Sequence, residues 1–224
     1  MNFYNQNYFT MKKSILKIFV LFLFFSSCKE QSKTDSESTH KDTYKEQTLG
    51  EDRTLYNEDF KWSIAIPENF NSVSPDEWEK LQNRGLEAIE NTAGEEIINQ
   101  VQTIFVFKNG DANYLESNHQ PFDSSVDGDY LQSCKEVNDL LYQTFKSQLP
   151  NTTIERSTSV EKIDNLEFQT FKVKINLPNE KAMHSISYTR LFGKKEFSVN
   201  IIYLDNQQGE KMLKAWRNSK FNKN

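Results

Sequence analysis

The chain has 224 residues, of which 36% are hydrophobic and 26% are charged, and its formal net charge is −5. This length accommodates one domain with a substantial core. The acidic balance disfavours nucleic acid as a partner, because proteins that bind nucleic acid neutralise its phosphates with Lys and Arg.

The first element along the chain is a secretory signal, expected over residues 1–27. It combines three lysines, an apolar run over residues 15–25 and small residues directly before Cys28. The apolar run is shorter than the roughly 20 residues that a bilayer-spanning helix needs. The segment before the second methionine, Met11, carries no charge, and Met11 is an alternative start of the signal.

The end of this signal, Phe25-Ser26-Ser27-Cys28, resembles the bacterial lipobox, whose cysteine receives a diacylglycerol and becomes the new N-terminus. Cleavage before Cys28 removes three lysines and no acidic residue, which takes the formal charge from −5 to −8. Because so acidic a chain would not adhere to anionic lipid by charge alone, acyl chains would supply the anchoring. We therefore expect attachment to a membrane through Cys28 in a bacterial cell envelope, either facing the periplasm or exposed at the surface.

Residues 28–55 are dominated by charged and small polar side chains and contain almost nothing to bury. Such a composition predicts a flexible, lipid-anchored tether. The following residues, 56–224, show no internal repeat and no break rich in Pro or Gly, so we expect a single globular domain there.

The first half of this domain is predicted to hold a strand, a helix and a second strand. Residues 60–67 alternate apolar and polar side chains up to Pro67, which is typical of a strand with one buried face. Ser74-Pro75-Asp76-Glu77 is a capping box, and the helix it begins is expected to end at Gly94. Residues 101–107 are β-branched and aromatic, which favours a central strand.

The second half begins with a polar segment, 111–128, which we expect to be a long loop. Apolar residues then recur at intervals of three and four over 130–149, predicting a helix that ends before Pro150. Four runs with strand-like composition follow, and a last helix is expected at 208–217. The four runs are residues 152–163, 166–177, 183–192 and 196–204.

Short separators between the four runs, such as Asp164-Asn165, imply antiparallel hairpins. The predicted order is β-α-β-α-β-β-β-β-α. The fold class is therefore α+β, with an antiparallel sheet of about six strands and helices packed on it.

This pattern is similar to the PsbP-like α/β/α sandwich, which includes periplasmic bacterial lipoproteins of the DcrB type. The resemblance rests on Ile64-Ala65-Ile66-Pro67 with Phe70 after it, on the late hairpins and on the closing segment 216–221. It implies a mostly noncatalytic module that binds another protein. A cystatin-like or other α+β fold is the competing interpretation.

Candidate ligands for an ion lie in the second half of the expected loop at 111–128. Asp123, Asp127 and Gly128 match the start of an EF-hand calcium loop, but Cys134 occupies the position where that loop requires a bidentate Glu. The sequence therefore favours a turn in which Asp127 or Asp129 caps the helix. A looser ion site made by Asp123, Asp127 and His119 is the alternative.

No sequence motif identifies a catalytic centre or a cofactor. Cys134 falls on the apolar face of a predicted helix and His184 on a predicted strand, so structural roles are favoured for both. The chain has no Gly-rich phosphate loop, nucleophile elbow, HExxH or CxxC pattern. We expect no cofactor, and a noncatalytic envelope protein that binds a protein partner through its sheet or through residues 111–128. A ligand- or ion-binding accessory protein, or a small hydrolase, is the alternative.

Overall fold

The computed structural model describes residues 46–49, 52–178 and 181–221. The expected signal peptide, Cys28 and most of the expected tether lie outside these residues. In the described part, no helix is long and apolar enough to cross a membrane.

The fold is built on a seven-stranded antiparallel sheet in the order β4-β5-β6-β10-β9-β8-β7. β7 and β4 form its two edges, and β6 and β10 pair with each other in its interior. The strands are β4 (Asn71–Ser72), β5 (Gln102–Lys108), β6 (Tyr114–Pro121), β7 (Thr153–Ile163), β8 (Leu166–Asn176), β9 (Ala182–Phe192) and β10 (Lys195–Tyr203).

A second, smaller sheet has the order β1-β2-β3-β11. Its strands are β1 (Glu46–Leu49), β2 (Asp52–Asn57), β3 (Trp62–Ala65) and β11 (Lys220–Phe221). β11 follows the last helix and pairs antiparallel with β3, so the two ends of the described chain meet in one sheet.

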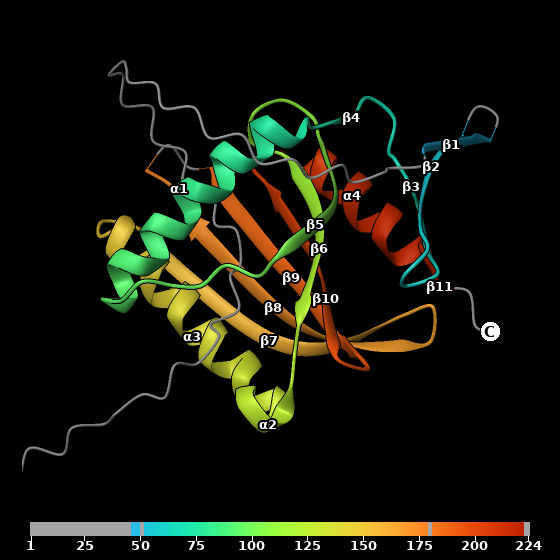
Figure 1. The fold of residues 1–224 in the computed structure, drawn as a ribbon. Helices are drawn as coiled ribbons and strands as arrows, with labels where there is room; N and C mark the ends of the chain where they lie inside the picture. The colour runs from blue at the N-terminus through green and yellow to red at the C-terminus, as the bar shows by residue number, and fades with distance from the viewer. Residues whose placement is uncertain (1–45, 50–51, 179–180, 222–224) are drawn as a thin grey trace, which may run out of the picture.

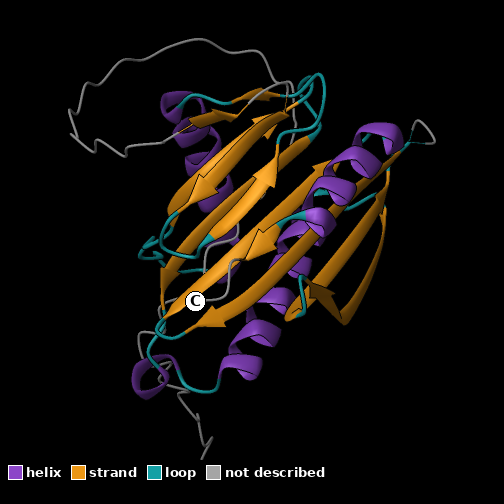
Figure 2. Cartoon of the chain, turned by 90° about the vertical axis from the view of Figure 1, so that its right-hand side faces the viewer, coloured by secondary structure: helices purple, strands orange, loops and turns teal. Residues whose placement is uncertain are grey.

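Helices cover both faces of the large sheet (Figures 1 and 2). Helices α1 (Pro75–Ala93) and α3 (Tyr130–Gln148) lie on one face, and α4 (Asn206–Asn218) lies on the other with the small sheet. The fourth helix, α2 (Ser124–Asp127), is a single turn that leads into α3. The arrangement is therefore layered, with the large sheet in the middle.

Each face of the large sheet has its own hydrophobic core. One core joins Trp62 of β3 and Trp216 of α4 to the sheet, and the two indole rings lie 6.0 Å apart in an edge-to-face arrangement. The other core joins Trp78 of α1 and Phe145 of α3 to the opposite face. Many of the aromatic residues therefore fill two interiors, which explains why strands such as β8 carry aromatic side chains on both faces.

Several local predictions are confirmed. Ser74 caps α1 and accepts a hydrogen bond from the Glu77 amide, and Gly94 ends the helix in the left-handed conformation at φ 76°. β7 and β8 form a hairpin whose turn residues, Asp164 and Asn165, have φ of 47° and 64°. The antiparallel sheet with helices packed on it is likewise present.

The expected loop at 111–128 is wrong for most of its length, because it contains the interior strand β6 and the short helix α2. β6 alternates Leu115 and Ser117 on one side with Glu116 and Asn118 on the other, and all four side chains are buried. Polar residues in a buried strand remove the apolar alternation from which a strand is normally predicted. The part of residues 111–128 that lies at the surface is therefore shorter than the sequence predicted.

The strand count also needs correction. β1 and all of β2 except Tyr56 and Asn57 fall within residues 28–55. Most of their residues are polar, which is why their composition predicted a tether, although Leu55 of β2 is buried in the core beside α4. The described residues form eleven strands in two sheets, where about six were expected.

Candidate functional site

Six buried polar side chains form a cluster, here called the polar ladder, on the paired strands β6 and β10. Directly opposed pairs make up the ladder, and every side chain in it is at most 8% exposed. The pairs are Glu116 with Asn200, Asn118 with Ser198, and Gln120 with Glu196.

The ladder lies on the face of the sheet that α1 and α3 cover. Leu115 and Ile201, which alternate with ladder residues, belong to the core beside α4. Tyr114 and Ile202 lie two residues from Glu116 and Asn200 on the same strands, and they belong to the core beneath α1 and α3. Since successive side chains of a strand point to opposite faces, the ladder adds a polar region to this second interior.

Hydrogen bonds between side chains hold the two carboxylates of the ladder. The Glu116 carboxylate accepts from Asn118 Nδ2 at 2.7 Å and from Asn200 Nδ2 at 2.6 Å. Asn200 in turn accepts from Ser187 Oγ at 3.0 Å, and Gln120 Nε2 donates to Glu196 at 2.7 Å. Buried carboxylates are costly unless they are hydrogen-bonded in this way.

The environment shifts the titration of the groups around the ladder. Burial raises the pKa of Glu116 to about 7, and the hydrogen bonds from Asn118 and Asn200 partly oppose this increase. Burial, followed by the charge of Glu196, raises the pKa of Tyr130 at the start of α3. Glu116 therefore has the proton affinity of an acid-base group, but it is 2% exposed and held by neighbours within the sheet.

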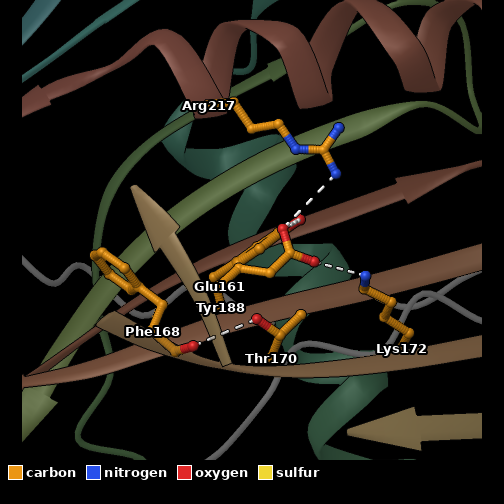
Figure 3. A network of polar contacts seen from close by, with 6 residues as sticks. All are labelled: Glu161, Phe168, Thr170, Lys172, Tyr188 and Arg217. Atoms are coloured by element: carbon orange, nitrogen blue, oxygen red, sulfur yellow. Dashed lines mark hydrogen bonds and ion pairs between the residues drawn. The ribbon is translucent and has the colours of Figure 1, made fainter. Parts of the chain in front are cut away.

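A second polar network lies on the opposite face, around Glu161 of β7 (Figure 3). Its carboxylate accepts from Lys172 Nζ at 2.6 Å and from the Tyr188 hydroxyl at 3.4 Å, and Arg217 Nη2 lies 3.7 Å away. Burial and the neighbouring Glu161 raise the pKa of Tyr188. The network joins β7, β8 and β9 to the end of α4.

The structure places the predicted ion ligands in separate roles. Asp123 caps α2, Asp129 caps α3 as predicted, and the Asp127 carboxylate accepts from the Asp123 amide at 2.6 Å. His119 lies on β6, where its ring centre is 5.5 Å from that of Phe60. No group of three or more His, Cys, Asp or Glu residues in the described ranges is arranged to hold a metal ion.

The two other singled-out residues lie in packed surroundings. Cys134 is half-buried on α3, with its sulfur 3.9 Å from Thr189 Oγ1. The His184 ring stacks on Tyr203 at 4.7 Å, and burial together with Lys174 lowers the pKa of His184. Both positions agree with structural roles.

An exposed apolar corner, here called the α2–α3 corner, remains at the surface of the segment once expected to be a loop. Val126 of α2 is 62% exposed and Leu131 of α3 is 57% exposed. The carboxylates of Asp123, Asp127 and Asp129 each accept a hydrogen bond from a backbone amide of this turn, which fixes its conformation. The corner therefore presents two large apolar side chains on a defined backbone.

An open groove of about 470 Å³ lies between α4 and the small sheet. Its floor includes Ile64 and Ala215, and three lysines lie along it, Lys211, Lys214 and Lys220. Lys220 lies 3.4 Å from Asp164, whereas Lys211 and Lys214 have no ion pair with any residue that the structure describes. Glu68 also lines the groove, which therefore combines apolar residues with three lysines and one carboxylate.

Sequence reasoning missed both the polar ladder and the groove. The ladder depends on the register between β6 and β10, which are separated by about 80 residues of chain, and no local motif encodes it. Because Ser117 and His119 are polar as well, residues 116–120 show no alternation that would have revealed the ladder. The groove depends on how α4 sits against β3, which the sequence alone does not fix.

Comparison with solved structures supports the expected fold. The solution structure of cyanobacterial PsbP (CyanoP) from Synechocystis sp. PCC 6803 matches with a TM-score of 0.50 and 10% identity, covering 78% of this chain and 96% of that one. No family model matches the chain, and no curated protein matches it in sequence. The chain therefore has a PsbP-like fold, and at this identity the likeness concerns the fold alone.

Proposed function

We propose that this chain is a lipid-anchored protein of the bacterial cell envelope whose domain binds another envelope protein without catalysing a reaction. The lipobox-like sequence at Cys28 supports the anchor. The proposal of protein binding rests on the exposed apolar residues of the α2–α3 corner. The sequence resembles the DcrB-type lipoproteins, which combine a PsbP-like fold with a lipid anchor.

The corner is distinctive because of where the exposed apolar residues lie. The described residues include four large hydrophobic side chains that are strongly exposed, and two of them, Val126 and Leu131, share this one corner. Single exposed apolar residues are common on protein surfaces, whereas apolar residues gathered on a defined backbone favour a contact site. A preorganised corner also loses little conformational freedom on binding.

The test is a crosslinking pull-down from membranes with the full chain. We expect one envelope protein to be recovered with the wild-type chain and to be lost with Val126→Asp and Leu131→Asp together, because two charges would be buried in the contact. Ile98→Asp is the matched control, since Ile98 is 64% exposed and lies away from the corner in sequence. Equal recovery from all three chains would rule out the corner as the contact surface.

A second function, binding of a small anionic ligand, is favoured by the groove beside α4. Pockets of this volume suit small molecules, and Lys211 and Lys214 would supply the charge. We expect Lys211→Gln with Lys214→Gln to abolish any binding of inorganic phosphate measured by calorimetry. Failure of the wild-type chain to bind phosphate or a carboxylate probe would remove this candidate.

A further inference from the structure

β7 forms an unusually long and regular edge of the large sheet. All eleven of its residues pair with β8 without a register shift, and no described strand pairs with its outer side. The opposite edge, β4, has only two residues. Proteins commonly guard sheet edges with short strands, bulges or proline, and β7 has none of these features.

The charged side chains of β7 are also paired within their own chain. Unpaired charges are another common guard, because they repel an incoming strand. Here each charge has a partner on a neighbouring element: Glu155 with Lys174 at 3.7 Å, Arg156 with Asp139 at 2.6 Å, Glu161 with Lys172 at 2.6 Å and Lys162 with Glu167 at 3.4 Å. Val160, between these charges, is 53% exposed.

Symmetry restricts how β7 can pair with a copy of itself. Two identical antiparallel strands in one continuous sheet are related by a two-fold axis perpendicular to the sheet, which keeps each face on its own side. Each residue must therefore lie opposite one that points to the same face, so the pairing is centred on a residue and not between two.

Only some of these centres avoid like charges directly opposite each other, which are destabilising. A centre at Thr158 places Glu155 opposite Glu161 of the second copy, and one at Ser159 places Arg156 opposite Lys162. A centre at Arg156 places that residue opposite its own copy.

A centre at Ser157 avoids all of these clashes while overlapping most of the strand. It places the exposed Val160 opposite Ile154 of the second copy, twice by symmetry, and Arg156 opposite Thr158. Arg156 lies diagonal to its own copy in this register, but Asp139 holds its guanidinium at 2.6 Å and balances its charge.

We propose that β7 is a self-association surface, through which two copies of this chain pair antiparallel about a two-fold axis at Ser157. The two seven-stranded sheets then form one continuous sheet, with the α3 helices of both copies on the same face. This surface is separate from the α2–α3 corner, so the self-association proposal is tested independently of the protein-binding proposal.

The experiment is thiol crosslinking of the full chain in detergent, in a background carrying Cys28→Ser and Cys134→Ser. Ser157→Cys places two thiols across the axis, where directly opposed Cβ atoms are about 5 Å apart. The matched control is Ser159→Cys, an exposed serine on the same face whose two copies would be about 14 Å apart along the paired strands. We expect a short bis-maleimide to give a covalent dimer with Ser157→Cys and little with Ser159→Cys.

Sedimentation gives the second readout. We expect Val160→Lys to lower the association constant of the dimer at least tenfold, because a charge would face Ile154 of the second copy. Val126→Lys should leave the association constant unchanged. A wild-type chain that sediments as a monomer at every concentration overturns the proposal. Equal crosslinking of the two cysteine variants also overturns it, since another register or another segment would then occupy the edge.

Discussion

The Glu116 carboxyl group lies within the large sheet, where two amide groups donate to it and no described cation pairs with it. Burial raises its pKa from 4.5 to about 7, so the folded protein binds a proton more tightly than the unfolded chain does. The resulting stability is fully present below about pH 4.5 and is lost as the pH rises through about 7. The difference corresponds to roughly 3 kcal/mol at most.

The raised pKa of Glu116 predicts how stability changes with pH. We expect the free energy of unfolding of the wild-type chain to fall as the pH is raised from about 5 to about 8, relative to Glu116→Gln, whose side chain does not titrate. Urea unfolding at a series of pH values measures the difference between the two slopes. Parallel pH profiles would mean that Glu116 titrates normally and is not buried as described.

At the scale of secondary structure, β6 is an interior strand of the large sheet that the sequence did not predict. Leu115 is fully buried in the core beside α4. We expect Leu115→Ala to lower the free energy of unfolding by about 2–5 kcal/mol, as large-to-small changes in packed cores do. Leu131→Ala, at a leucine that is 57% exposed, should change it by less than about 0.5 kcal/mol.

Chemical denaturation of both variants measures this contrast. If Leu115→Ala were as mild as Leu131→Ala, residues 114–121 would behave as the surface loop that their composition predicted. The assignment of β6 to the interior of the sheet would then be wrong.

Local chemistry explains which elements could be predicted. Ser74 and Gly94 delimit α1 because capping and left-handed backbone are properties of individual residues. The Asp164-Asn165 turn is fixed in the same local way. β6 could not be predicted, because the pairing that buries its polar side chains, such as Glu116 with Asn200, involves residues of β10 that lie far along the chain. The ladder and the groove escaped prediction for the same reason.

At the scale of the whole molecule, the proposed anchor of the PsbP-like domain is a lipid on Cys28, which lies outside the described residues. We expect Cys28→Ala to abolish fatty-acid labelling and to weaken attachment to the membrane, because the acyl chains that would supply the anchoring are then absent. Fractionation together with metabolic labelling by an alkyne fatty acid measures this. Unchanged labelling in Cys28→Ala would show that the lipid is attached to another residue.

The most direct test of the protein-binding function is site-specific photo-crosslinking in living cells. A photoreactive amino acid would replace Leu131 at the α2–α3 corner in one chain and Ile98 in a control chain. Both positions are strongly exposed, so neither replacement should disturb folding. We predict a crosslink from position 131 to one envelope protein and none from position 98. Crosslinks of equal yield at both positions, or none at either, would contradict the proposal that this corner binds a partner.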